Sequence, residues 1–214
     1  MINKDVNPDF QAISKTFPLI LASASPRRKS LLEQVGIPFR SLPANMDESG
    51  FEGEPASVVR LLAEKKAKSA CPDAGESWIL GADTIVLLGE TIFGKPRDSD
   101  DARFMLRLLS GKEHEVVTGF CLIDPSGEPV HIEHISTLVR VKTLSDQEIN
   151  AYIATGEPFG KAGSYAIQGI GSFLVEGING SYTNVVGLPV CALIKTLLVS
   201  GALEEFPLTA LDVE

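Results

Sequence analysis

Residues 22–30 (ASASPRRKS) bring small hydroxyl residues and three adjacent cations to the expected start of a helix. Ser25 followed by proline is typical of an N-cap and a first helical residue, which puts Arg27 and Arg28 in the first turn. The amino end of a helix carries a positive partial charge, so cations there are unfavourable unless an anion joins them. With the hydroxyl of Ser23 nearby, the segment predicts a phosphate-binding site. The alternative is a basic turn surrounded by water.

Asp83 is the one carboxylate in the apolar segment 78–88 (WILGADTIVLL), whose composition indicates a buried strand. A buried carboxylate without a partner costs several kcal/mol. Asp83 must therefore meet a cation, a metal ion or a group of hydrogen-bond donors, and such a residue is a candidate for catalysis. The alternative is a salt bridge that only stabilises the fold.

Lys65 follows Leu61 by four residues and Leu62 by three, a spacing that places all three on one face of a helix. We expect that face to be buried. A lysine on it must meet a negative group, so Lys65 is a candidate for binding a phosphate or a carboxylate.

Residues 89–95 (GETIFGK) match the spacing of a phosphate-binding Walker A loop as far as Lys95. The next residue is Pro96, which offers magnesium no hydroxyl, and the Gly89-Glu90 pair indicates a hairpin turn. We therefore reject a Walker A loop and keep Lys95 as a single cation that contacts phosphate.

Several separated cations and carboxylates occur without the pattern of a nucleophile triad or a zinc site. This combination suits hydrolysis of a phosphoanhydride, in which cations absorb charge while a carboxylate activates water. Asp47 and Glu48 add a carboxylate pair that could hold a divalent ion through oxygen. Taken alone, such a pair is most often a polar loop.

These residues must be positioned by short strands and amphipathic helices that alternate along the chain. The expected strands cover residues 18–22, 78–88, 91–93, 115–124, 130–144 and 172–175, and the expected helices begin near residues 26, 55, 99, 146 and 189. The pattern SDQE at residues 145–148 predicts a capping box at the fourth helix. Strands that alternate with helices, with hairpins among them, predict an α/β fold on a mixed sheet flanked by helices.

Composition limits the partners of this chain. Its 19 basic and 28 acidic side chains give a formal charge of −9 over 214 residues, which argues against a nucleic-acid partner. The apolar stretch 185–203 contains Pro189 and Lys195, and the first residues lack an apolar core, so we expect neither a membrane partner nor a secretory signal. We predict a cytoplasmic protein with a frayed leader at 1–16, one domain at 17–204 and a tail at 205–214.

Seven short motifs occur in an order that is specific for one family. The sequence resembles the Maf family, the Maf-like nucleoside triphosphate pyrophosphatases named for septum formation. The motifs are LASASPRR at 21–28, RLLAEK at 60–65, GADTIV at 81–86, GKP at 94–96, LSG at 109–111, AGSYAIQ at 162–168 and VGLP at 186–189.

The resemblance implies an elongated, two-lobed, Maf/ITPase-like domain on a twisted sheet, often a homodimer. It implies hydrolysis of a nucleoside triphosphate to the monophosphate and pyrophosphate with magnesium, or alternatively manganese. Asp83 matches the proton acceptor, although a role as metal ligand beside Glu48 is equally open. Arg28, Lys65 and Lys95 match phosphate-binding positions, so the implied catalytic set is Asp83, Lys65 and Arg28.

Substrate choice in the family follows three positions, here Arg27, Thr84 and Gln168. These residue types resemble the dTTP/UTP pyrophosphatase branch, and with Ser23, Ser25 and Lys95 they complete the implied substrate-binding set. A glutamine amide can pair with the N3–H and O4 edge of uracil or thymine if neighbours fix its orientation. Two alternatives remain open: the same chemistry on 7-methyl-GTP, and a regulator of septum formation that binds nucleotides without catalysis.

Overall fold

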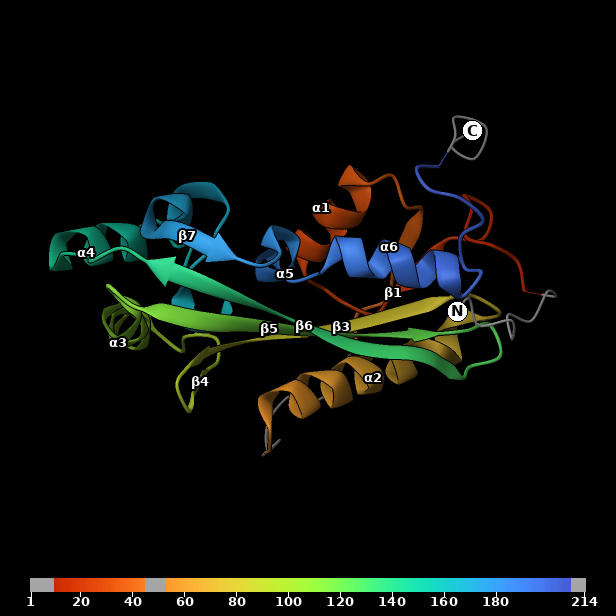
Figure 1. Ribbon diagram of the computed structural model, residues 1–214, viewed down its shortest axis with the longest axis horizontal. Coiled ribbons are helices and arrows are strands. Elements are labelled where there is room, and N and C mark those ends of the chain that lie inside the picture. The colour runs from red at the N-terminus through yellow and green to blue at the C-terminus, as the bar shows by residue number, and fades with distance from the viewer. Residues whose placement is uncertain (1–9, 45–52, 209–214) are drawn as a thin grey trace. The chain divides into compact units, whose positions relative to one another are not determined.

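The computed structural model describes residues 10–44 and 53–208, in which helices accompany a seven-stranded sheet (Figure 1). The strands are β1 (Leu19–Leu21), β2 (Phe39–Ser41), β3 (Ile79–Leu88), β4 (Thr91–Phe93), β5 (Glu113–Ile123), β6 (Pro129–Val141) and β7 (Val175–Asn179). Their order is β2-β1-β3-β5-β6-β7, and β4 pairs with β3. Because β1 runs parallel to β2 and β3 while β3–β4 and β6–β7 are antiparallel, the predicted mixed α/β fold is confirmed.

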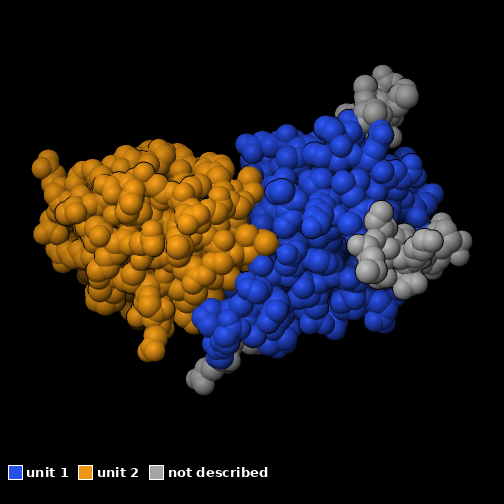
Figure 2. All heavy atoms as spheres, in the orientation of Figure 1, with its two compact units in different colours: residues 1–83, 119–134, 187–214 blue, residues 84–118, 135–186 orange. Residues whose placement is uncertain are grey.

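The chain folds into two compact units (Figure 2). Unit 1 comprises Met1–Asp83, Gly119–His134 and Gly187–Glu214, and unit 2 comprises Thr84–Thr118 and Ile135–Val186. The chain therefore passes between the units four times, and β3, β5 and β6 each contribute residues to both.

Unit 1 sandwiches its strands between helices. In Figure 1, α2 (Pro55–Ala74) lies on one side of β1 and β3, and α1 (Pro26–Gln34) and α6 (Val190–Val199) lie on the other. Two glycines allow α2 to lie very close to the strands. A Cβ added to Gly81 of β3 would lie 2.6 Å from the backbone nitrogen of Ala67, and one added to Gly119 of β5 would lie 2.5 Å from the carbonyl of Val59. The strand positions that face α2 therefore need glycine.

Part of the segment predicted to form a frayed leader packs against unit 1. Ile13 is buried, and its amide donates to the carbonyl oxygen of Ala202 at 2.8 Å. The indole nitrogen of Trp78 donates to the carbonyl oxygen of Gln11 at 3.0 Å. Residues 10–16 thus belong with the fold, while residues 1–9 lie outside the described part of the chain.

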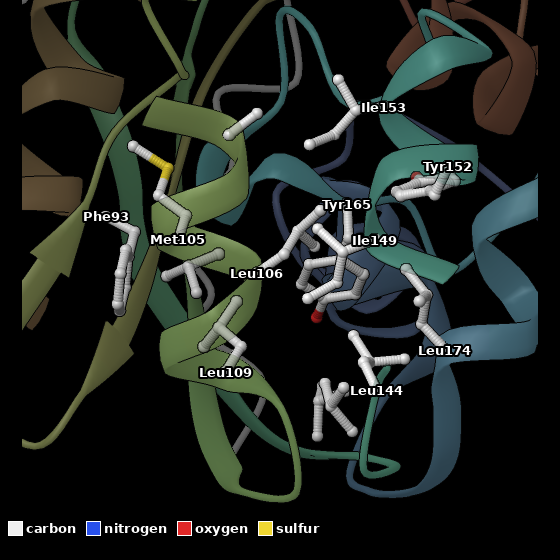
Figure 3. Packing of buried hydrophobic residues seen from close by; sticks show 14 of the residues in the cluster. Phe93, Met105, Leu106, Leu109, Leu144, Ile149, Tyr152, Ile153, Tyr165 and Leu174 are labelled. Atoms are coloured by element: carbon white, nitrogen blue, oxygen red, sulfur yellow. The ribbon is translucent and has the colours of Figure 1, made fainter. Parts of the chain in front are cut away.

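Unit 2 has its own core, to which α3 (Ser99–Leu109) and α4 (Asp146–Ala154) contribute (Figure 3). Asp98 caps α3 by accepting from the amide of Asp101 at 2.8 Å. Ser145 and Glu148 form the predicted capping box of α4. Both caps fix where the helices begin, so their apolar faces meet. The core residues labelled in Figure 3 are Phe93, Met105, Leu106, Leu109, Leu144, Ile149, Tyr152, Ile153, Tyr165 and Leu174.

The sequence prediction lacked β2 and the helix at Tyr182–Val186, and it misplaced the last strand. Residues 172–175 were expected to form a strand, but Gly169–Leu174 form a 3-10 helix, η2, and β7 begins only at Val175. Helix α2 begins at residue 55 as expected and continues through Pro72 to Ala74. Ala70 and Ala74 are buried, and this packing offsets the hydrogen bond that proline cannot donate.

A short 3-10 helix, η1 (Ala162–Ser164), and helix α5 (Tyr182–Val186) complete the described elements. No helix in residues 10–44 and 53–208 is long and apolar enough to cross a membrane.

Candidate functional site

Asp83 lies on β3 and is buried together with a cation. Only 11% of its side chain is exposed, and the Nζ atom of Lys66 lies 2.5 Å from its Oδ1 atom. The Lys66 side chain is 8% exposed, so the two charges meet with little water around them. The prediction that Asp83 must meet a cation, a metal or hydrogen-bond donors is confirmed, and the partner is a lysine.

That lysine is not the one expected from the sequence. Lys65 is exposed, and Leu61, which was used to define the inward face, is 42% exposed. The buried face of α2 runs instead through Val59, Ala63, Ala67 and Ala70, and Lys66 lies on it. The placement of Lys65 on the inward face was therefore wrong by one residue, which is 100° around a helix.

The segment after β1 is held by Arg28 rather than left in solvent. Arg28 is buried; its Nε donates to the carbonyl oxygen of Gly187 at 2.8 Å, and its Nη1 donates to Ser23 Oγ at 3.1 Å. Ser23 Oγ also accepts from the amide of Ser25 at 3.2 Å. Ser25 is the N-cap residue of α1 as predicted, but its side chain makes no capping hydrogen bond. The expectation that the Ser25 hydroxyl caps the helix is therefore corrected. The hydroxyl that binds a backbone amide here is that of Ser23, and the amide is that of Ser25.

Helix α1 keeps the electrostatic features of an anion site. No acidic residue lies in its first turn. Arg27 is half-buried, and burial lowers its pKa below the usual range, although a guanidinium in a protein stays protonated at neutral pH. The helix amino end and Arg27 therefore both favour a negative group there.

The Ser23–Arg28 group begins just after β1, and Asp83 lies within the neighbouring strand β3, three residues beyond Leu80. Leu21 of β1 pairs in parallel with Leu80 of β3, and the last bond between them joins the Ala22 amide to the Leu80 carbonyl oxygen. β1 ends there, while β3 continues to Asp83 and beyond. The carboxyl end of a parallel strand pair is where α/β proteins bind ligands.

Thr84, the next residue of β3, belongs to a hydrogen-bond network of unit 2. Its Oγ1 lies 2.9 Å from Oγ1 of Thr118, which in turn donates to the backbone carbonyl oxygen of Asn184 at 3.0 Å. A threonine hydroxyl has one proton, so Thr118 must accept from Thr84. Any other partner of the Thr84 hydroxyl must then donate to it.

The remaining predicted residues of unit 2 are placed by loops. Lys95 is exposed and follows β4, where the carbonyl oxygen of Gly94 accepts from the Gly163 amide at 3.1 Å. Gln168 is half-buried and immediately precedes η2.

Of the two residues expected to bind a metal ion, only Asp83 lies among the described residues. Glu48, its predicted companion, lies outside the described residues, as does Asp47. Among residues 10–44 and 53–208, no three His, Cys, Asp or Glu side chains gather as a metal cage. Magnesium is commonly held by one or two carboxylates together with substrate phosphates, and Asp83 fits the first of these requirements.

Comparison with known families decides the classification. The model of the Maf family, described as Maf-like protein, matches residues 18–199. The chain belongs to the Maf family. A curated Maf relative, the dTTP/UTP pyrophosphatase of Citrifermentans bemidjiense, is 53% identical over 190 residues, which cover 88% of this chain and 98% of the relative. The dTTP/UTP pyrophosphatase of Ruminiclostridium cellulolyticum is 50% identical over 174 residues, which cover 80% and 90%.

Likeness to solved structures is more distant. The nucleoside-triphosphatase / dITP/XTP pyrophosphatase of Mycobacterium abscessus matches this Maf chain with a TM-score of 0.38 and 16% identity, over 65% of this chain and 95% of that one.

Sequence reasoning missed three residues that support the Maf motifs. Lys66 could have been found from the alanines at 63, 67, 70 and 74, because small residues mark the side of a helix that packs most closely. Thr118 contacts Thr84, and Asn184 contacts Thr118, only after the chain has folded, and no local pattern predicts those contacts.

Proposed function

We propose that this Maf protein is a nucleoside triphosphate pyrophosphatase that hydrolyses dTTP and UTP to the monophosphate and pyrophosphate. The observation that carries the proposal is the buried Asp83–Lys66 pair on β3, the strand beside β1, after which the Ser23–Arg28 group begins. The activity for which relatives about 50% identical over most of the chain are named supports the same reaction.

In this proposal the triphosphate binds where α1 begins. The amino end of the helix and the guanidinium groups of Arg27 and Arg28 supply the positive charge that phosphates need. Ser23 and Ser25 shape this segment, and Lys95, exposed after β4 in unit 2, is retained as a proposed phosphate contact because of its GKP motif. Lys65, exposed on α2, is retained only as a peripheral cation.

Asp83 is proposed to accept the proton of the attacking water. The water oxygen forms a new bond to phosphorus, the bridging bond between the α- and β-phosphates breaks, and pyrophosphate leaves. Lys66 holds the carboxylate in place at 2.5 Å. A divalent ion, which we propose to be magnesium, would be bound by Asp83 and by phosphate oxygens and would neutralise charge there.

The proposed preference for pyrimidines follows from two side chains of unit 2. The Thr84 hydroxyl can only accept from a further partner, because its proton is used on Thr118. Uracil and thymine carry a proton on N3, whereas cytosine presents a lone pair there. We propose that Thr84 and Gln168 together favour the protonated edge. Homodimer formation and a cytoplasmic location stay predictions of the sequence.

A pyrophosphate-release assay over the common nucleoside triphosphates, with and without magnesium, tests the proposal. We expect magnesium-dependent release from UTP and dTTP, and a loss of about 10²–10⁴-fold in Asp83→Asn, the usual contribution of a general base. Asp100→Asn is the matched control, because Asp100 forms an ion pair with Arg103 while its side chain is 94% exposed. Nucleotide binding without release would favour the regulator, and preferential hydrolysis of 7-methyl-GTP would favour the other branch.

A further inference from the structure

Two side chains hold the segment on both sides of Gln168. Tyr152 belongs to α4, and Glu157 follows that helix. One carboxylate oxygen of Glu157 accepts from the amide of Ile170 at 3.0 Å, and the other accepts from the amide of Gly171 at 2.7 Å. Both amides lie within three residues of Gln168 on its carboxyl side. The two bonds together fix the direction in which the chain leaves Gln168.

Tyr152 binds the segment on the amino side. Its hydroxyl oxygen accepts from the amide of Ala166 at 3.1 Å, and the Glu157 carboxylate lies beside that hydroxyl. The tyrosine ring is only 1% exposed and packs in the core of unit 2. The Ala166 amide is thus bound by a buried side chain that neighbours the carboxylate bound to Ile170 and Gly171.

The backbone is shaped to admit this contact. Gly169 has a φ of +65°, which a side chain would disfavour. A Cβ on Gly171 would lie 2.5 Å from the Tyr152 hydroxyl and 3.0 Å from a carboxylate oxygen of Glu157. Glycine at 169 and 171 therefore lets the chain wrap around the Glu157 carboxylate.

Glu157 remains ionised in this position. Burial alone would raise the pKa of its carboxyl group, but the hydrogen bonds from Tyr152, Gly171 and Ile170 and the charge of Lys161 outweigh burial and lower it. The backbone of Glu157 is held as well, because its amide donates to Thr155 Oγ1 at 3.1 Å and its carbonyl oxygen accepts from Lys161 Nζ. Hydrogen bonds to an ionised carboxylate are about twice as strong as neutral ones.

We propose that Glu157 and Tyr152 are positioning residues that fix Gln168 so that its side-chain amide meets the pyrimidine in one orientation. An amide carries a donor at one side and an acceptor at the other, and only a fixed orientation distinguishes uracil from cytosine. The inference rests on the proposed function for its substrate, but the clamp formed by Tyr152 and Glu157 is defined by contacts within unit 2 alone.

Two variants remove the clamp from different sides. Glu157→Gln keeps the shape of the side chain but leaves one carbonyl oxygen in place of two carboxylate oxygens, so one of the two loop amides loses its acceptor. Tyr152→Phe keeps the buried ring and removes only the hydroxyl. Glu176→Gln is the matched control, because Glu176 pairs with Arg140 on the surface and its side chain is 52% exposed.

Hydrogen exchange followed by mass spectrometry measures the clamp without any substrate. We expect the amide that loses its acceptor in Glu157→Gln, that of Ile170 or of Gly171, to exchange about tenfold faster or more, as for a lost charge-assisted hydrogen bond. Tyr152→Phe should accelerate exchange at Ala166, while Glu176→Gln should match the parent protein. Exchange unchanged in both clamp variants would overturn the inference.

Steady-state kinetics with UTP and CTP measure the consequence. In both clamp variants we expect KM for UTP to rise about tenfold with kcat within about twofold, and the preference for UTP over CTP to fall about tenfold. A loss confined to kcat, or an unchanged preference, would overturn a positioning role. If the parent protein itself does not hydrolyse UTP, the proposed function fails, and the exchange result still decides whether the clamp exists.

Discussion

Replacing Lys66 by methionine removes the ammonium group 2.5 Å from Asp83 while keeping a long side chain on α2. The side chains of the pair are 8% and 11% exposed, so the remaining carboxylate stays largely shielded from water. Breaking a buried ion pair by removing one partner costs about 3–5 kcal/mol. At 2–4 °C per kcal/mol for a chain of this size, the melting temperature should fall by about 6–20 °C.

The matched control is Lys65→Met, the same change one residue earlier on the same helix. Lys65 is exposed, and surface substitutions usually change stability by no more than about 0.5 kcal/mol. Differential scanning calorimetry of both variants makes the comparison directly. The double variant Lys66→Met with Asp83→Asn removes both charges and should recover more than half of the loss, because neutral replacements of buried pairs are often tolerated. Equal melting temperatures for the two lysine variants would refute the assignment of Lys66 as the partner of Asp83.

Three further predictions concern other parts of the chain. Hydrogen bonds lower the pKa of Glu148 from 4.5 to about 2, so its contribution to stability is full above pH 4.5 and disappears as the pH falls through 2; NMR titration of the carboxyl carbon should report this pKa. Gly81→Ala should destabilise the protein by about 1–3 kcal/mol or more, because the new Cβ would lie 2.9 Å from the Cβ of Ala67. A Cβ on Gly94 would meet nothing within 4 Å, so Gly94→Ala should change stability by less than about 0.5 kcal/mol. Urea titrations measure both variants. Burial lowers the pKa of His114 from 6.5 to about 4, so its ring signals should stay constant from pH 8 to 6, and its burial as a neutral group should cost stability as the pH falls from 6.5 to 4.

Most elements could be predicted because their signals are local. The turn at Gly89 and Glu90 gives the β3–β4 hairpin, and Ser145 with Glu148 gives the capping box of α4. The strand expected at 172–175 failed for the opposite reason. Its backbone is determined by the Glu157 carboxylate, which lies more than ten residues earlier in the sequence and binds the amides of η2.

The candidate site divides in the same way. A carboxylate in an apolar strand requires a partner wherever the strand occurs, so the sequence could predict that Asp83 meets a cation. Which lysine meets it depends on the rotation of α2, and that rotation is set by the glycines of β3 and β5 against which the helix packs. Leucine spacing alone indicated the wrong side, because the close contact is made by alanines and Leu61 faces outward.

The four passages of the chain between the units also affect synthesis on the ribosome. Unit 1 begins with β1 but needs α6, whose last residues are made about 120 positions after Asp83. At about 5–20 residues per second, the apolar strands of the first segment wait roughly 6–24 s before α6 can cover them. A nascent chain stalled before residue 187 would leave these strands without α6 to cover them. For the same reason neither unit can be cloned as one uninterrupted stretch of the gene.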